Sequence, residues 1–561
     1  MKKQVIYLII FAVLIMGIVL VSSGRFDFNN DGVTNIADLQ ALASHYQGKT
    51  AYNSTYDLNG NGKVDLFDIV SEAKNVNTSS GSGGAGVGAI DRNAILDAQY
   101  PTPVAPIPLR TFYVDAQSGS DTTGTGTSSS PWQTLTKVMS TAKAGDRFYL
   151  RGMFNDELGH QSQSPAGTAL NPIEVMNWPG YTATIATNTA TYPTLWLKSG
   201  MDYWWFQGLD LQQGVYTSSS NSVWTVSGSS YHTFVNNTFD SSSIKLSGSV
   251  GTRIYENKFI GVIGSQSANS GDGVFTQQGS NNDQIVRNNF NADIWHATMT
   301  IGGYQTSSDA DCLNTTIVRN FINNTAAGGL DVQGKADGAI IAGNVIENTG
   351  RQNAAGVLSK TGIALDGVRN AEVYWNKVWN SQSDALKLQA YIFWGFSQLA
   401  ENNHVYQNTF FDNGGCGINF VLQHNVTGLV NNTIEDNIFW KNDQTGAASY
   451  GGKSYEIQAN FYNMVGQTEM WTPTDAKGNI VRNNIVANSA TPDSGWLLII
   501  RQSGDGGDLG YTMGQAESNL PGWQNNIEAD PLFISESTPD FNLQSGSPGI
   551  NAGRVIPGVT Y

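Results

Sequence analysis

Residues 371–378 read Ala-Glu-Val-Tyr-Trp-Asn-Lys-Val, an alternating run that ends in an Asn-x-apolar unit. Alternation of this kind sends every second side chain to the same face of a β-strand. Successive copies of the unit lie 20, 31, 32, 24, 32, 32, 29 and 46 residues apart. There are nine copies, and their asparagines are Asn237, Asn257, Asn288, Asn320, Asn344, Asn376, Asn408, Asn437 and Asn483.

A repeat of this length is typical of a solenoid in which each coil contributes a few short strands and surplus residues loop out. A turn at each asparagine calls for a left-handed backbone, and stacked carboxamides can hydrogen-bond along the axis. The repeat therefore predicts a mostly β protein, a right-handed parallel β-helix over residues 110–561. A β-propeller or a sandwich is the alternative, and the absence of hairpin dipeptides between the units disfavours it.

Composition limits the function classes. The 561 residues carry 30 Lys+Arg against 46 Asp+Glu, a net charge of −16, which disfavours binding to nucleic acid. Two cysteines exclude a disulfide scaffold. In the predicted solenoid, at least three coils of ~4.8 Å separate Cys312 from Cys416. A disulfide requires Cα atoms within about 7 Å, so both thiols are expected to be free and buried.

Two segments near the N-terminus match each other position for position, DFNNDGVTNIAD at 27–38 and DLNGNGKVDLFD at 57–68. Oxygen side chains at loop positions 1, 3 and 5, a glycine at 6 and an acid at 12 form the donor pattern of a calcium loop. Carbonyls would serve at position 7, and position 9 would bind directly or through water. The expected ligands of two Ca²⁺ ions are Asp27, Asn29, Asp31, Val33, Asn35 and Asp38, then Asp57, Asn59, Asn61, Lys63, Asp65 and Asp68. A pair of Asn/Asp-rich turns without metal is the alternative.

The doubled D-x-N-x-[DN]-G-x5-D motif, with an apolar-periodic helix after each loop, resembles a type I dockerin over residues 25–76. The resemblance implies docking onto a cohesin of a scaffold or cell surface. Dockerins that bind cohesins commonly carry hydroxyl residues at loop positions 10 and 11, where this chain has Ile36-Ala37 and Leu66-Phe67. These apolar pairs could pack on a different cohesin type or on a neighbouring domain.

Residues 1–24 combine two lysines, an apolar run from Val5 to Val21 and small residues, the pattern of an export signal. The length of the run leaves open both a cleaved signal peptide and an uncleaved membrane anchor. Either way, a secreted or cell-surface location is expected, where Asn-x-Ser/Thr sequons could accept glycans in a suitable host. Residues 77–109 are expected to form a linker, first Gly/Ser-rich and then Pro-containing.

The two ends of the large domain resemble secreted polysaccharide-lyase-like β-helices over residues 110–555. The opening has a strand at 112–115 and then a helical stretch at 131–143. One face of that stretch would cap the open end of the solenoid, and it comprises Trp132, Leu135, Val138 and Met139. The closing runs resemble the terminal signature of the same superfamily, and they lie at 530–533, 540–543 and 546–553.

The segments 362–366 and 384–388 resemble the catalytic region of family 9 pectate lyases, in which a lysine on a similar strand is the base. The resemblance implies Lys387 as a base of lowered pKa, with Asp366 and Asp384 beside it. It also implies a further Ca²⁺ on the β-helix face, which would neutralise a uronate carboxylate during elimination.

The chain departs from that family where the aspartate cluster should be, because it has Thr361 and Ala364 there. A second chemistry therefore stays open, in which two carboxylates hydrolyse a glycosidic bond. Its candidates are Asp331, Asp337, Asp366 and Asp384. The six histidines show no metal-ligand spacing, so a transition-metal site is not expected.

Aromatic rings can stack on the apolar faces of sugars, and two clusters are candidates for this contact. One is the run Tyr-Trp-Trp-Phe at 203–206. The other follows Lys387 and supplies Tyr391, Phe393, Trp394 and Phe396.

Two functions follow from these patterns. The first is an exported, calcium-binding dockerin/β-helix protein that acts on polysaccharide, with calcium-assisted elimination as the leading chemistry. The second is a non-catalytic surface protein, such as an adhesin, sheath or filament subunit that self-assembles, in which the solenoid is a rod. Contact with a membrane is expected only through residues 1–24, and only if they are retained.

Overall fold

A computed structural model describes residues 91–550. Excluded from that description are 187–192, 213–222, 226–227, 265–270, 304–309, 335, 351–360, 394–395, 423–427, 443–454, 462–477, 488–497, 503–508 and 538–539. The calcium loops and the apolar run at the N-terminus therefore lie outside the described residues. Residues Arg92–Asn542 form one compact unit.

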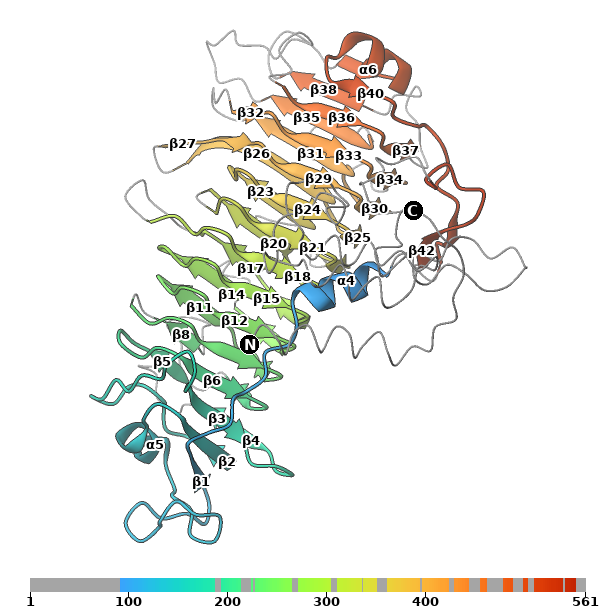
Figure 1. The fold of residues 1–561 in the computed structure, drawn as a ribbon. Helices are drawn as coiled ribbons and strands as arrows, with labels where there is room; N and C mark the ends of the chain where they lie inside the picture. The colour runs from blue at the N-terminus through green and yellow to red at the C-terminus, as the bar shows by residue number, and fades with distance from the viewer. Residues whose placement is uncertain are drawn as a thin grey trace, which may run out of the picture. The chain divides into compact units, whose positions relative to one another are not determined.

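This unit is a parallel β-helix, as the repeat predicted (Figure 1). Each coil contributes strands to three parallel sheets, which we name sheets I, II and III in the order in which the chain meets them. Sheet I consists of β1 (Arg110–Asp115), β2 (Asp146–Phe154), β3 (Ile173–Asn177), β6 (Trp204–Gln207), β9 (Thr233–Val235), β12 (Arg253–Tyr255), β15 (Gln284–Val286), β18 (Thr316–Val318), β21 (Ile340–Ala342), β24 (Glu372–Tyr374), β29 (His404–Tyr406), β33 (Thr433–Glu435), β36 (Ile480–Arg482) and β40 (Trp523–Gln524).

Sheet II begins with the last residues of β2, which pair with β4. Its other strands are β4 (Ala183–Ala186), β7 (Asp210–Gln212), β10 (Thr238–Asp240), β13 (Lys258–Ile263), β16 (Asn289–Ile294), β19 (Phe321–Asn323), β22 (Val345–Glu347), β25 (Lys377–Trp379), β30 (Thr409–Phe411), β34 (Ile438–Trp440) and β37 (Ile485–Ala487).

Sheet III carries the longest loops. It consists of β5 (Leu195–Leu197), β8 (Val223–Thr225), β11 (Ile244–Ser247), β14 (Asp272–Gln277), β17 (Ala297–Ile301), β20 (Gly328–Gln333), β23 (Ile363–Asp366), β26 (Leu386–Phe393), β31 (Ile418–Leu422), β35 (Ile457–Phe461) and β38 (Leu498–Gln502). Smaller pairings join β26 to β27 (Phe396–Gln398), β28 (Ala400–Glu401) to β32 (Leu429–Val430), β38 to β39 (Leu509–Tyr511), and β41 (Phe533–Ser535) to β42 (Asp540–Leu543).

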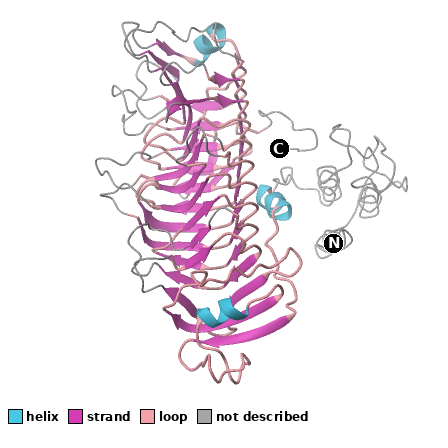
Figure 2. Ribbon diagram, turned by 90° about the vertical axis from the view of Figure 1, so that its left-hand side faces the viewer, coloured by secondary structure: helices cyan, strands magenta, loops and turns pink. Residues whose placement is uncertain are grey.

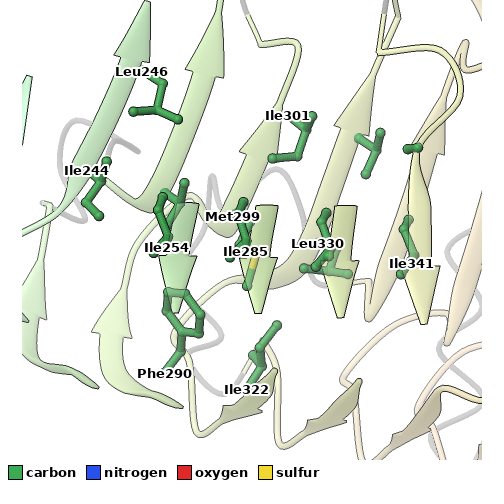
Figure 3. Close-up of a cluster of buried hydrophobic side chains, with 14 of the residues drawn as sticks. Ile244, Leu246, Ile254, Ile285, Phe290, Met299, Ile301, Ile322, Leu330 and Ile341 are labelled. Atoms are coloured by element: carbon green, nitrogen blue, oxygen red, sulfur yellow. The ribbon is translucent and has the colours of Figure 1, made fainter. Parts of the chain in front are cut away.

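The core lies between the three sheets, because alternate side chains of every strand point inward. Figure 3 shows Ile254 and Ile285 of sheet I facing Phe290 of sheet II and Met299 of sheet III. The rings of Phe239, Phe259 and Phe290 stack on consecutive coils, at centroid distances of 4.6 and 4.3 Å. Stacked in this way, the coils form one continuous apolar core.

The asparagines of the repeat form a ladder between sheets I and II, as predicted. From Asn257 onward, each ladder asparagine accepts two hydrogen bonds from the asparagine of the preceding coil, from its backbone N–H and from its side-chain amide, at 2.9–3.1 Å. Each amide also donates to a backbone carbonyl. The ladder extends past the predicted repeat to Asn526, whose N–H donates to Glu517.

Two details of that prediction are wrong. The ladder member of the ninth coil is Asn484, and the neighbouring Asn483 has φ 56°. The left-handed residue is thus the one that precedes the ladder asparagine, and Arg287 and Trp375 occupy that position in other coils. Shorter ladders occupy the other two corners, with Asn403, Asn432 and Asn479 before sheet I, and Asn413, Asn442 and Glu456 after sheet II.

Helices occupy both ends. Helix α5 (Leu135–Thr141) buries Leu135, Val138 and Met139 against the first coils, beside the buried Trp132, as the capping prediction required. Helix α6 (Met513–Asn519) begins with a capping box in which Thr512 and Gln515 bond reciprocally. Cys312 and Cys416 are buried and are not joined in a disulfide, as predicted. Within the described residues, no helix has both the length and the apolar content to cross a membrane.

The second half of the predicted linker packs on the β-helix. Helix α4 (Arg92–Gln99) and residues 100–109, which we call the N-terminal strap, run along the outer side of sheet I (Figures 1 and 2). Leu96 and Tyr100 are buried there in an apolar cluster with residues of sheet I. Arg287 holds the strap by donating to the Asp97 carboxylate at 3.2 Å and to the Tyr100 carbonyl at 2.8 Å.

The C-terminal segment that contains β41 and β42 covers part of the outer side of sheet II. Phe541 of β42 lies 5.1 Å from Trp379 and 5.4 Å from Phe411, measured between ring centroids. Glu536 accepts hydrogen bonds from Trp440 and Lys441, both at 2.7 Å. The described residues near the chain ends thus lie on sheets I and II and leave the outer side of sheet III to its own loops.

Candidate functional site

The outer face of sheet III presents a column of polar side chains. Strand register places Thr300 beside Asp331, Asp331 beside Ala364, Ala364 beside Lys387, and Lys387 beside Asn419. The residues between them in sequence, such as Leu330 and Val332, point into the core. Two of the predicted catalytic residues, Lys387 and Asp366, thus lie on neighbouring strands of this face, and the small Ala364 lies between Asp331 and Lys387.

Lys387 forms an ion pair with Asp366. The Lys387 ammonium lies 3.1 Å from each carboxylate oxygen of Asp366. Burial alone lowers the pKa of Lys387, but the charges of Asp366, Asp331 and Asp384 and the hydrogen bond to Asp366 outweigh it, so the pKa is raised. The direction is opposite to the lowered pKa that the resemblance implied. Lys387 is a fixed cation rather than a neutral amine near pH 7.

In contrast to Lys387, Asp331 titrates close to neutral pH. Its side chain is only 6% exposed, and Oδ2 accepts a hydrogen bond from the Gln333 amide at 2.8 Å. Oδ1 is buried without a hydrogen-bond partner among the described residues. Burial, and then the nearby charge of Asp366, raise the pKa of Asp331 to about 6. Asp331 can therefore hold or release a proton near neutral pH, as a general acid or base must.

The Asp384 side chain forms hydrogen bonds with the neighbouring coil and is not exposed on the outer face. It is buried, and it accepts hydrogen bonds from the Asn419 amide and the Cys416 backbone N–H, both at 2.9 Å. Burial raises its pKa, and Lys387 contributes a nearby positive charge. Asp384 thus orients Asn419 beside Lys387. The fourth candidate carboxylate, Asp337, pairs with Arg369 next to sheet I and does not join the group.

The sequence analysis missed a second ion pair beside this group. His296 Nδ1 lies 2.8 Å from Asp272 Oδ1, which also accepts a hydrogen bond from the Thr300 hydroxyl at 2.6 Å. Both side chains are at least nine-tenths buried. The only sequence signal was a histidine directly before a strand of sheet III, since its partner is 24 residues earlier.

The predicted aromatic contacts divide between described and undescribed residues. Strand β26 runs on from Lys387 through Tyr391 and Phe393 and pairs with β27, with Phe393 opposite Phe396, so these residues belong to a hairpin that prolongs the Lys387 strand. Trp394 lies outside the described residues. In the other cluster, Trp204, Trp205 and Phe206 are all buried, so the expectation that they face sugar is wrong.

The described part of the β-helix holds no group of three His, Cys, Asp or Glu side chains that could bind a metal ion. Between the carboxylates of sheet III, the position for a cation is taken by the Lys387 ammonium. These residues do not fit a calcium site, so the further Ca²⁺ expected on the β-helix face is not supported. The ligands predicted for two ions at 27–38 and 57–68 lie outside the described residues.

Comparison with known proteins agrees with this architecture. Residues 25–76 match the model of the dockerin type I domain, and residues 299–463 match the right handed beta helix region. No curated protein matches the chain.

Among solved structures, a lacto-N-biosidase from Eubacterium ramulus is 14% identical with a TM-score of 0.41, over 66% of this chain and 65% of that one, so this chain spans under two thirds of its length. An alginate lyase from Paenibacillus sp. is 15% identical with a TM-score of 0.39, over 62% and 99%. A surface adhesin of Streptococcus pneumoniae is 12% identical with a TM-score of 0.44, over 67% and 90%.

At these identities the likeness concerns the fold alone. The two family matches fall on the doubled calcium motif and on the central coils of the solenoid, where the sequence patterns placed them. The chain therefore joins a dockerin type I module at residues 25–76 to a β-helix whose residues 299–463 match the right-handed family.

Proposed function

We propose that the protein is an exported enzyme that cleaves polysaccharide on the outer face of sheet III, with Asp331 and Asp366 as a carboxylate pair. The observation that carries the proposal is the contrast between them. Asp331 is buried and has a pKa of about 6, whereas Asp366 forms an ion pair with Lys387. Glycoside hydrolysis requires two carboxyl groups in different surroundings, one of which has a raised pKa and can act as the acid.

The register gives the pair a workable separation. Asp331 is paired with Ala364, and Asp366 lies two residues further along β23. With ~4.8 Å between strands and ~3.3 Å per residue, the two Cα atoms are about 8 Å apart. The retaining and inverting mechanisms require carboxyl groups about 5 to 9.5 Å apart, which two side chains on the same face of a sheet can reach from this Cα spacing.

Each residue then has one role. Asp331 donates a proton to the leaving oxygen, because its raised pKa keeps part of it protonated near pH 6. Asp366 acts on the opposite side, on water or on the anomeric carbon. Lys387 is a positioning residue that holds the Asp366 side chain through their ion pair, and Asp384 orients Asn419 beside Lys387.

The charges of the site favour a neutral glycan. Asp331, Asp366 and Asp384 outnumber Lys387, so a uronate would meet net negative charge here. Elimination remains the second candidate because Lys387 lies on the outward column, next to Ala364 and Asn419. The raised pKa of Lys387 opposes a role as its base.

The N-terminal residues would export the enzyme and attach it near its substrate. We propose that the module at 25–76 binds two Ca²⁺ ions and attaches the enzyme to a cohesin of a scaffold or cell surface, on the basis of the family match. Residues 1–24 would direct export and place the protein outside the cell.

Cleavage assays on the full chain test the proposal. The substrates are a panel of neutral and acidic polysaccharides with Ca²⁺, read both as new reducing ends and as the ultraviolet absorbance of an unsaturated product. We expect reducing ends without absorbance, and a loss of roughly 10²-fold or more in Asp331→Asn and Asp366→Asn. The matched control is Asp240→Asn on sheet II, which should keep full activity.

Other outcomes would change the conclusion. An absorbance signal from an acidic substrate that disappears in Lys387→Ala would replace hydrolysis by elimination. If no substrate is cleaved, the enzyme proposal fails, and the non-catalytic adhesin, sheath or filament function takes its place.

A further inference from the structure

We infer that His296, fixed by Asp272, is a positioning residue for Asp331, and that its imidazolium sets the pH at which the site's acid gives up its proton. The inference rests on the proposed function, in which Asp331 is that acid. It adds a residue that lies outside both the carboxylate pair and the Lys387 ion pair.

The geometry links the His296–Asp272 pair to Asp331 through Thr300. His296 directly precedes β17, and on that strand Thr300 is the register partner of Asp331 on β20. Thr300 donates to the same Asp272 oxygen that bonds His296, so the pair is linked to Asp331's neighbour in the column. In the order of sheet III, the Asp331 strand β20 lies between β17 on one side and β23, the strand of Asp366, on the other.

The surrounding charges keep the imidazole protonated. Burial lowers the pKa of His296, but the hydrogen bond to Asp272 and the charges of Asp272 and Asp331 outweigh it, so the pKa is raised above 6.5. Asp272 also faces the ammonium of Lys245, which lies 5.3 Å from the ring centroid of Phe275. The imidazole of His296 is therefore protonated more readily than an ordinary histidine beside the titrating Asp331.

Some neighbours of Asp331 raise its pKa and others lower it. Burial and Asp366 raise its pKa, while Lys387, the Gln333 hydrogen bond and His296 lower it. Without His296 the neutral form of Asp331 would persist to higher pH. Because a general acid works only while protonated, the alkaline limb of cleavage would move upward with it.

The variant that tests this is His296→Gln, whose amide can still donate to Asp272 but carries no charge. We expect the alkaline limb of the cleavage profile to move up by about half to one pH unit. The matched control is His404→Gln, which removes a histidine that pairs with Glu435 on sheet I. Its profile should coincide with that of the wild type. A cleaving wild type with an unmoved limb in His296→Gln would overturn the inference.

A second measurement does not depend on cleavage. Histidine labelled with ¹³C in the ring reports each titration by NMR in the full chain, and the signal missing from His296→Gln identifies His296. We expect the pKa of His296 to fall in Asp331→Asn, because a neighbouring negative charge is lost. It should stay constant in Asp384→Asn, since Asp384 interacts with Lys387.

The cleavage assay and the NMR titration test the proposed function and the coupling of His296 to Asp331 separately. If the wild type cleaves nothing, the proposed function fails, and the NMR titration alone decides whether His296 and Asp331 are coupled. An unchanged His296 titration in a folded Asp331→Asn protein would overturn the coupling, whatever the activity.

Discussion

Asn288 donates both its backbone N–H and its side-chain amide to the side-chain oxygen of Asn320, at 2.9 and 3.0 Å. Its own side-chain oxygen accepts the same two bonds from Asn257, and its amide also reaches the carbonyl of Ile254. One buried side chain thus bonds to polar groups on both neighbouring coils at once.

Replacement of Asn288 by alanine should therefore be severe. The substitution leaves buried donors on Asn257 and a buried carbonyl on Ile254 without partners, and each costs about 1–3 kcal/mol. We expect the free energy of unfolding in urea to fall by about 3 kcal/mol or more. The adjacent Asn289 is exposed, so Asn289→Ala is the matched control and should change stability by less than about 0.5 kcal/mol. Equal losses in the two variants would contradict the structural role of the ladder.

The N-terminal strap should depend on Leu96. Its side chain is fully buried, and Gly343, at φ +62°, allows the approach, because a Cβ there would lie 2.4 Å from Leu96 Cδ1. We expect Leu96→Ala to cost about 2–4 kcal/mol of local stability and to speed proteolytic cleavage of residues 92–109. Val104, which is 86% exposed on the same strap, provides the control Val104→Ala. Equal cleavage rates in both variants and the wild type would show that the strap is not held by this contact.

The His404–Glu435 pair should give stability a defined pH window. The hydrogen bond from His404 is the main cause that lowers the pKa of Glu435 to about 2. Burial lowers the pKa of His404, but Glu372 and Glu435 raise it to about 9. The stabilisation from Glu435 is lost as pH falls from 4.5 through 2, and that from His404 is lost as pH rises from 6.5 through 9.

Urea unfolding of the wild type and His404→Gln should therefore differ most near pH 5 to 6 and converge above about pH 9. His160→Gln changes an exposed histidine and serves as the control. A stability difference that stays constant from pH 5 to pH 10 would contradict the ion-pair assignment.

Asp283 occupies a position before sheet I at which other coils have a ladder asparagine. It directly precedes a strand of sheet I and accepts the Thr252 backbone N–H at 2.8 Å, as Asn403 accepts that of Ala371. Its Oδ2 is buried without a partner among the described residues, and burial raises its pKa well above the ordinary value. The folded state therefore retains a proton that the unfolded chain releases above about pH 4, and stability falls as pH rises.

We expect Asp283→Asn to stabilise the protein at pH 7 by about 1 kcal/mol or more, with a smaller gain near pH 4. Glu528→Gln removes an exposed charge and is the control. Urea titrations at the two pH values make the comparison. A gain that does not depend on pH would mean that the carboxyl is ionised in the folded protein.

The sequence predicted the solenoid because its repeat is local, with an asparagine and a strand in every coil. It misplaced the ninth ladder position, because Asn483 and Asn484 are adjacent and only the coil geometry shows which amide faces inward. The strap was assigned to the linker because its partner Arg287 is 187 to 190 residues away.

The site was predictable only in part. Lys387 and Asp366 could be named from their strands. The 3.1 Å contact between them depends on the register of neighbouring coils. Because the number of loop residues varies from coil to coil, that register cannot be deduced from the sequence. The protonation of Lys387 follows from that contact, so its direction could not be read from the chain. The same holds for His296, whose partner Asp272 lies on the preceding coil.

The asparagine ladder joins residues as few as 20 and as many as 47 positions apart with bonds of the same length. The spacing of the strands is thus independent of how much chain is inserted between them. A loop beside Asp331 could be lengthened, shortened or exchanged for one from another solenoid without shifting Asp366 or Lys387 out of alignment. The protein therefore offers a scaffold on which substrate preference can be redesigned one loop at a time.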